Sequence, residues 1–139
     1  MKIVGFSLSK ILAQRKEKIE GKLQINQNID IKDVKPEKIP FSKDEALKLD
    51  FNFSITYSGD SAKVEFEGHL ILIPEKEEFK KIQDSWKKKQ VPDEFRIPLF
   101  NFIMSKCNIK ALNLEDEMAL PFHIPLPRIN PENLQKDQS

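Results

Sequence analysis

The amino-acid sequence predicts an α+β domain, in which a four-stranded antiparallel sheet is followed by C-terminal helices packed on one of its faces. Two observations predict this fold. Through residues 1–73, hydrophobic residues alternate with polar ones, which directs them to one face of each strand. After Pro74 the hydrophobic residues recur every three or four positions, as on a helix. A sheet with one apolar face must cover it, and the second half of the chain can supply the cover.

The third and fourth strands are predicted as a hairpin. Every odd position from Leu47 to Tyr57 is apolar, and residues 58–61 supply turn-forming side chains. The apolar series then resumes through residues 62–72. Gly68 interrupts it, which predicts a bulge or a close backbone approach.

The first two strands are less regular. Residues 23–31 alternate except at Gln27, and residues 3–12 carry apolar side chains on both parities. We expect residues 17–21 to join these strands. Residues 36–46, which contain Pro36 and Pro40, then form the longer link to the third strand.

Two helices are expected after Pro74. Phe79, Ile82 and Trp86 form a narrow apolar stripe within residues 75–90, where glutamates at the start and lysines at the end suit the helix dipole. A second helix is predicted from Asp93 to about Cys107. Pro98 either kinks it or marks the start of its regular part. Residues 115–120 can add one more turn.

The end of the chain is rich in proline. Four prolines lock residues 121–131 into an extended segment, and the polar residues 132–139 are expected to be loose. Residues 1–131 therefore read as one domain that includes this C-terminal segment. A length of 139 residues gives no reason to propose a second domain.

Composition argues against several classes of function. The 23 Lys and Arg nearly cancel the 22 Asp and Glu, so no global charge attracts DNA or anionic lipid. One cysteine excludes an internal disulfide and fits a reducing compartment, and the two histidines have no metal-ligand spacing. Glycine-rich phosphate loops, membrane-length apolar runs and signal-peptide patterns are absent. We expect a cytoplasmic protein that is not an enzyme and uses no metal or cofactor.

The order of a sheet followed by a helical layer resembles the protomer of the SecB export chaperones. The segment Pro92-Asp93-Glu94-Phe95-Arg96-Ile97-Pro98 is similar to the twin-proline start of the main SecB helix. The segment from Ser105 to Leu114 looks like the stretch that leads from that helix to a Leu-Asn-Leu triplet. The element order extends over residues 1–114, and the resemblance is to a small, archaeal-type SecB-like protein.

This resemblance implies a homotetramer that holds unfolded polypeptides in long apolar grooves without using a nucleotide. It does not extend to every SecB property. SecB chaperones are strongly acidic and pass their clients to an ATPase, whereas this chain is near neutral and has a lysine-rich first helix. Its proline-rich segment after Leu114 also differs from the SecB C-terminus.

Two sets of apolar residues are candidates for polypeptide binding. Phe79, Ile82 and Trp86 can line a client groove, or they can pack on the sheet or on a second protomer. In the C-terminal segment, Phe122, Ile124 and Leu126 can dock on another protein, fold back on their own domain or reach a neighbouring protomer. Cys107 is expected to be a small buried hydrophobe.

An alternative function uses the lysines. Lysines near Trp86 can contact RNA phosphates while the indole stacks on a base, or they can simply be solvated. The residues are Lys80, Lys81, Lys87, Lys88 and Lys89. On that view the protein is an adaptor on the ribosome or on another RNA–protein assembly. Because the predicted sheet has an apolar face and open edges, we also expect a homodimer or homotetramer.

Overall fold

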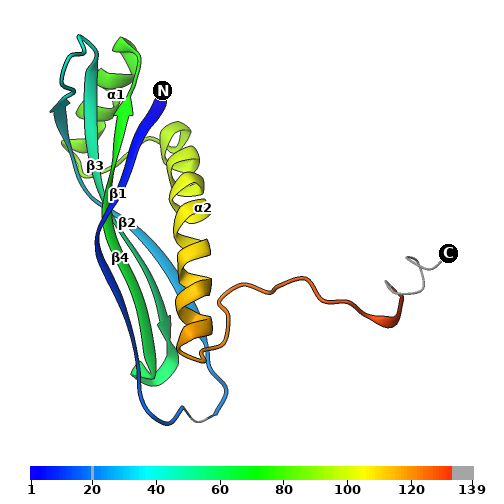
Figure 1. The fold of residues 1–139 in the computed structure, drawn as a ribbon. Helices are drawn as coiled ribbons and strands as arrows, with labels where there is room; N and C mark the ends of the chain where they lie inside the picture. Colours follow the sequence, from blue (N-terminus) through cyan, green and yellow to red (C-terminus); the bar gives the residue numbers. More distant parts are fainter. Residues whose placement is uncertain (20, 133–139) are drawn as a thin grey trace.

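The structure, a computed structural model, describes residues 1–19 and 21–132. Its strands are β1 (Lys2–Arg15), β2 (Ile25–Lys38), β3 (Glu45–Tyr57) and β4 (Ala62–Ile73), followed by helices α1 (Lys76–Trp86) and α2 (Asp93–Glu117). A short 3-10 turn, Ser58–Asp60, closes the β3–β4 hairpin. The sheet has the order β1-β4-β3-β2, and all neighbouring strands are antiparallel (Figure 1). The predicted α+β architecture is therefore confirmed.

The core lies between the apolar face of the sheet and α2. The β3–β4 register places Leu49 opposite Leu70, and Phe53 opposite Phe66. The rings of that second pair stack with their centroids 5.7 Å apart. Because partners across the ladder share one face of the sheet, the register gathers the large apolar side chains into a continuous surface.

Helix α2 covers this surface with a stripe at intervals of four residues. The stripe consists of Phe95, Leu99, Ile103, Cys107 and Ala111, all of them buried. The prediction that this helix ends at Cys107 was wrong, because the buried stripe continues beyond that residue. No glycine or proline follows Cys107 until Pro121, so the stripe and the helix continue to Glu117. The helix begins at Asp93 as predicted, and Pro98 lies inside it.

Bulges explain the irregular pattern of β1. The register shifts between Ile3 and Gly5 and again between Leu8 and Lys10. Each extra residue moves the apolar series to the other parity, because side chains alternate faces along a strand. Apolar residues on both parities can thus face the same side of the sheet.

Strand β2 is longer than predicted, for a related reason. Its register shifts between Ile31 and Asp33, after which Val34 continues the apolar face. Pro36 lies within the strand and not in the link, because β2 is an edge strand and needs a hydrogen-bonding partner on one side only. The connection to β3 is correspondingly short, at residues 39–44.

Helix α1 is shorter than the predicted residues 75–90. The backbone N–H of Glu75 donates to the Glu78 carboxylate at 3.0 Å, which caps the start of the helix. At the other end, Lys89 has a left-handed backbone with φ of 57°. The three lysines after Trp86 therefore form a turn and not a last helical turn. The predicted joint at residues 17–21 and the predicted loose tail include positions 20 and 133–139, which lie outside the described residues.

Gly68 confirms the predicted close approach. A Cβ atom built on it would lie 2.3 Å from the Ser7 carbonyl oxygen and 3.1 Å from the Phe51 ring. The neighbouring strand β1 carries its second bulge beside this position. The glycine therefore lets the backbones of β1 and β4 meet over a large core ring.

We expect Gly68→Ala to lower the free energy of unfolding by about 1–3 kcal/mol, because the added methyl group meets fixed backbone. Urea denaturation followed by circular dichroism measures the change. Gly5→Ala is the matched control, since the atom nearest to its Cβ would belong to the Ile71 side chain, at 3.2 Å, and the nearest backbone atom would lie 4.0 Å away. Equal losses for the two variants would contradict this explanation.

Candidate functional site

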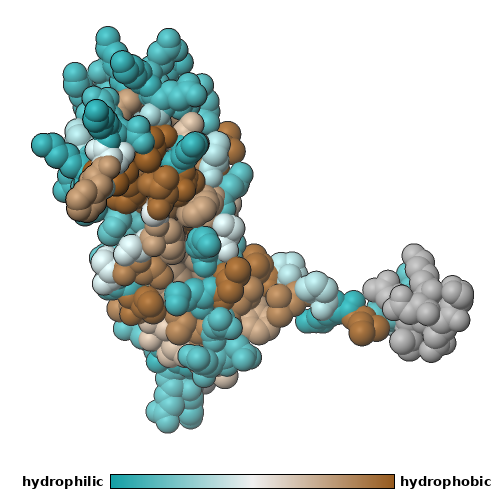
Figure 2. Space-filling model, turned by 45° about the horizontal axis from the view of Figure 1, so that its top comes forward, coloured by the Kyte–Doolittle hydropathy of each residue, from teal (hydrophilic) through white to brown (hydrophobic). Residues whose placement is uncertain are grey.

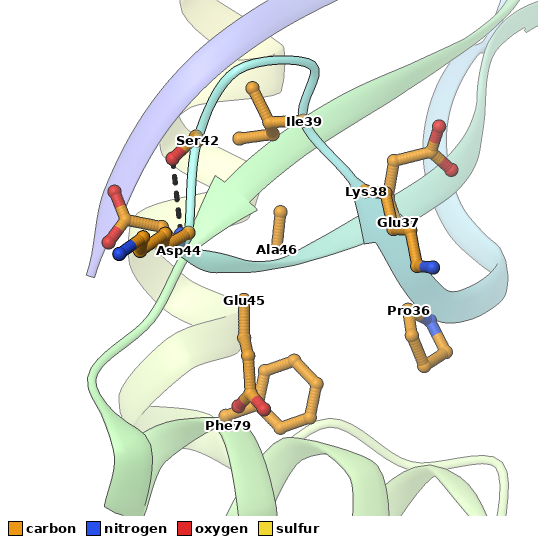
Figure 3. Close-up of a pocket in the computed structure, with 10 residues that line it drawn as sticks. Pro36, Glu37, Lys38, Ile39, Ser42, Asp44, Glu45, Ala46 and Phe79 are labelled. Carbon is orange, nitrogen blue, oxygen red and sulfur yellow. Dashed lines mark hydrogen bonds between the residues drawn. The ribbon is translucent and has the colours of Figure 1, made fainter.

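A groove runs between edge strand β2 and helix α1, which we call the β2 groove. It consists of three hollows that follow one another along β2. The first holds about 500 Å³ and is lined by the end of β2, the β2–β3 connection and Phe79 of α1. Figure 3 shows Phe79 rising from α1 beside Glu45, with Pro36 and Ala46 around the hollow.

Trp86 forms the wall between the other two hollows. The smaller hollow, of about 310 Å³, is also lined by Val34 of β2. The larger hollow, of about 560 Å³, is also lined by Ile29, Ile31 and Phe100. The Lys89 ammonium lies 5.1 Å from the centre of the indole ring, a cation–π arrangement that supports the ring from one side. Apolar side chains thus line each hollow, and in the larger one they are mixed with polar and charged side chains such as Asp93 and Arg96.

Charged side chains also line the hollows, and two pairs of them lie close together. Asp93 pairs with Arg96 at the start of α2, and Asp84 pairs with Lys87 at 3.7 Å. These pairs are exposed, so each adds little stability. The charged residues of each hollow are of both signs, so no single sign dominates the groove.

The predicted α1 stripe is divided between core and groove. Ile82 is fully buried and belongs to the core, whereas Phe79 and Trp86 are half-buried and line the hollows. Of the five lysines, Lys81 pairs with Glu94 at 3.6 Å, Lys87 pairs with Asp84 and Lys89 lies over Trp86. Lys80 and Lys88 are exposed. The cluster thus lies beside the groove, and three of its members contact other side chains.

The C-terminal residues lie elsewhere. Figure 1 shows the segment after α2 leaving from the end of the molecule opposite α1. Phe122 and Leu126 are exposed and Ile124 is half-buried. The structure therefore does not bring these three residues together with Phe79 and Trp86 in one site.

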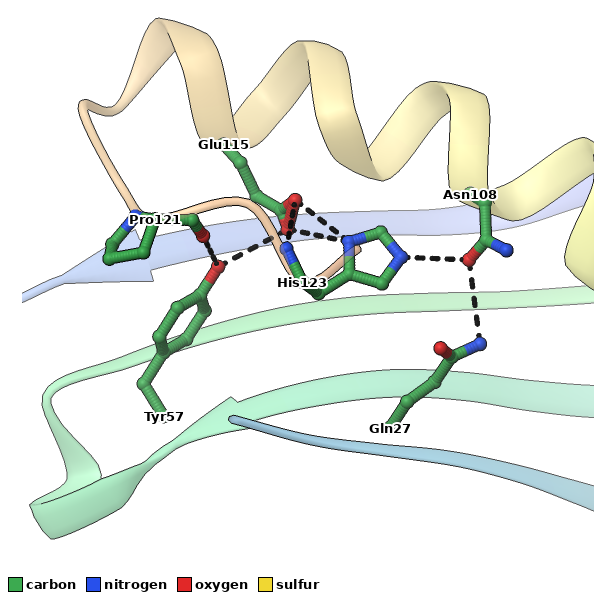
Figure 4. Close-up of polar contacts among 6 residues, drawn as sticks. All are labelled: Gln27, Tyr57, Asn108, Glu115, Pro121 and His123. Carbon is green, nitrogen blue, oxygen red and sulfur yellow. Dashed lines mark hydrogen bonds and ion pairs between the residues drawn. The ribbon is translucent and has the colours of Figure 1, made fainter. Parts of the chain in front are cut away.

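A buried polar network fixes the first part of this segment (Figure 4). The Glu115 carboxylate is fully buried in α2, and its oxygens lie 2.8 and 2.9 Å from Nδ1 of His123. The His123 backbone N–H donates to the same carboxylate at 3.2 Å. Nε2 of His123 lies 2.8 Å from the Asn108 side-chain oxygen, which in turn accepts from Gln27 of β2. The histidine ring is thus held between two side chains of α2, and one of these also contacts β2.

Tyr57 completes the network from β3. Its hydroxyl group lies 2.6 Å from the Pro121 carbonyl oxygen and 3.2 Å from Glu115, and donates its proton to these acceptors. Burial, together with the Glu115 carboxylate, raises the pKa of this hydroxyl above its ordinary value, so it stays a donor. The network holds the segment after α2 in place. It does not look like a catalytic site, because its hydrogen-bonding groups already have partners within the protein.

Sequence reasoning did not find this network. Glu115 was seen only as part of an extra turn, and His123 only as a residue of the tail. The stripe at intervals of four along α2 could have revealed Glu115, since it places a carboxylate at the next buried position after Ala111. A buried carboxylate requires a partner, and the histidine that follows α2 is an obvious one.

Other parts of the chain offer little chemistry. Burial raises the pKa of the Cys107 thiol to about 12, which confirms it as a buried hydrophobe with little thiolate character. Within residues 1–19 and 21–132, no group of three His, Cys, Asp or Glu side chains could hold a metal ion. In the same part of the chain, no helix is both long enough and apolar enough to cross a bilayer.

No family model and no curated protein matches the chain. Among solved structures, it is similar to Rv1957, a SecB-like chaperone of Mycobacterium tuberculosis that was solved in complex with a ChAD peptide from the Rv1956 HigA1 antitoxin. The TM-score is 0.55 at 15% sequence identity, over 93% of this chain and 89% of that one. The fold is SecB-like.

This likeness confirms the fold that the sequence resemblance implied. The part of the resemblance from Ser105 to Leu114 needs a correction, because this stretch lies inside α2 and does not lead away from it. The kinship with an archaeal-type relative stays a prediction, since the solved neighbour is mycobacterial.

We expect His123→Ala to lower the free energy of unfolding by about 3 kcal/mol, because it leaves the buried Glu115 carboxylate without its histidine partner. Glu115→Leu should cost a comparable amount. The double variant should lose less than the sum of the two, with a coupling of about 1–3 kcal/mol. Urea denaturation of all four proteins measures this cycle. Strictly additive losses would show that the two side chains do not act as a pair.

Proposed function

We propose that this protein is a non-enzymatic, chaperone-like protein that holds unfolded or partner polypeptides in the β2 groove. The observation that carries the proposal is that two aromatic side chains, Phe79 and Trp86, are only half-buried and line hollows open to solvent beside the edge strand β2. Such a surface can accept many sequences, because it makes apolar contacts and presents no fixed charge pattern.

The edge position of β2 supports an extended guest. Within the described sheet, β2 pairs with β3 alone, so the backbone groups on its other side have no ladder partner. A polypeptide lying along the groove can form main-chain hydrogen bonds there while its alternate side chains enter the hollows. Ile82 contributes indirectly, because its buried side chain anchors α1, the helix that carries Phe79 and Trp86, to the core.

The SecB-like fold gives further support, since the mycobacterial neighbour was solved with a peptide. We carry this to the present chain as a peptide-binding role and not as a particular client. The RNA-adaptor alternative is less favoured, because Lys81, Lys87 and Lys89 are engaged with Glu94, Asp84 and Trp86. A stacking role would also require Trp86 to leave the groove wall.

Self-association is part of the proposal. Besides the edge strands, the molecule exposes large apolar side chains on β1 and α2, namely Val4, Ile11, Ile97 and Ile109. Figure 2 shows hydrophobic side chains gathered on one face of the body, between hydrophilic ends. We expect a homodimer or homotetramer. Light scattering at micromolar concentration that returned a particle of 16.2 kDa would contradict this expectation.

The holding activity is tested with insulin reduced by dithiothreitol, whose B chain aggregates and scatters light. Stoichiometric protein should suppress the scattering. Trp86→Ala should need at least about tenfold more protein for the same suppression, since buried aromatic anchors contribute about 2 kcal/mol or more. Phe79→Ala tests the first hollow in the same way.

Ile109→Ala is the matched control, because Ile109 is exposed on α2 and lines none of the three hollows. Thermal unfolding of each variant establishes that it is folded at the assay temperature. Scattering that stoichiometric wild-type protein leaves unchanged would refute the proposed function.

A further inference from the structure

The segment that follows the buried network carries exposed apolar side chains. We call residues 124–131 the tail. Leu126 is 46% exposed and Ile129 is 81% exposed. Figure 1 shows the tail projecting from the body, and three of its eight residues are prolines, which favour an extended backbone. An extended segment of this kind loses little conformational entropy when it binds. Burying its apolar side chains away from water contributes favourable free energy.

The buried network sets the direction of the tail. His123, the residue before it, is held through its ring and its backbone by Glu115, and Tyr57 holds the carbonyl group of Pro121. Because these contacts are buried, they fix the backbone at residues 121–123 and with it the direction in which the tail leaves the body. It starts at the level of Glu115, near the C-terminal end of α2.

The tail is too short to fill the β2 groove of its own chain. From Glu115 back to Asp93, where the groove begins, α2 rises by 22 residues of about 1.5 Å, or about 33 Å. Eight residues at about 3.1 Å each reach about 25 Å. A tail turned back along α2 would therefore end before the hollows beside Trp86 and Phe79.

The β2 groove of a second copy has the required length and chemistry. It runs beside β2 from Ile29 to Ile39, which at about 3.3 Å per residue spans about 33 Å. The hollow beside Phe79 is lined mainly by apolar surface, which suits the side chains of Ile124, Leu126 and Ile129, and the larger hollow beside Trp86 also offers polar groups to the backbone of the tail. We propose that the tail of one copy of this chain occupies the β2 groove of a second copy.

This inference rests on the proposed function and gives a way in which client binding is regulated. A docked tail covers the hollows that a client would use, so a client must displace it. The same contact links copies head to tail, because helix α1, which lines the groove, and the root of the tail lie at opposite ends of the molecule (Figure 1).

Trp86, the single tryptophan of the chain, reports on the groove directly. A synthetic peptide of residues 121–132 contains no tryptophan and can be titrated into dilute full-length protein. We expect a saturable change in Trp86 emission. A peptide carrying Leu126→Glu and Ile129→Glu should bind at least tenfold more weakly, because each aliphatic side chain contributes when it is buried. No change in emission at millimolar peptide would overturn the proposal.

The full-length double variant Leu126→Glu, Ile129→Glu provides the second measurement. Its association midpoint in light scattering should rise at least tenfold, and it should suppress insulin aggregation at a lower concentration than wild type. Ile109→Glu is the control and should leave the titration with the tail peptide unchanged. Unchanged association of the double variant would overturn the proposal.

The outcomes separate this proposal from the proposed function. If the protein holds reduced insulin but the tail peptide leaves Trp86 unaffected, the tail proposal fails and the proposed function stands. If neither insulin nor the peptide is bound, both fail. If Ile109→Glu abolishes association and the tail variant does not, the exposed face of α2 joins the copies, and the tail proposal is wrong.

Discussion

Helix α2 and the apolar face of the sheet depend on each other, and the rest of the structure depends on their contact. The sheet gathers residues such as Leu49, Phe53 and Phe66 on one face, and α2 covers them with one stripe. Neither surface could remain in water, because burying apolar area is the dominant favourable term in folding. The polar network and the direction of the tail follow from where α2 lies, and the start of α2 lines the larger hollow beside Trp86.

The fold could be predicted from the sequence because alternation and helical spacing report directly on burial. The β3–β4 hairpin and the start of α2 at Asp93 are read from these patterns, and the structure has both. The bulges in β1 and β2 could not be read in this way. An extra residue switches the parity of the apolar series, and only the register with the neighbouring strand reveals it.

The candidate site was predictable only in part. Phe79 and Trp86 stand out in the sequence because aromatic side chains on a narrow helical stripe are conspicuous. Their partners on β2, such as Val34, come from a segment about fifty residues earlier, which no local pattern connects to α1. The network around Glu115 and His123 likewise joins α2 and the tail to β2 and β3, so it exists only in the folded chain.

Two kinds of contact hold the C-terminal half in place. Apolar contacts position α2 without directional preference, while the satisfied polar network gives the chain after α2 a single direction. The arrangement leaves one end of the molecule with an open groove and the other with an exposed tail. Under the proposed function, a guest polypeptide and the tail would compete for the same groove.

Native-state hydrogen exchange in low concentrations of denaturant tests most directly whether the sheet and α2 form one cooperative unit. The slowest amides of α2, around Leu99 to Ala111, should exchange through the same opening as those of the central strands β3 and β4, with equal opening free energies. Opening of α2 at a free energy several kcal/mol below that of the strands would contradict the account, because the sheet would then persist with its apolar face uncovered.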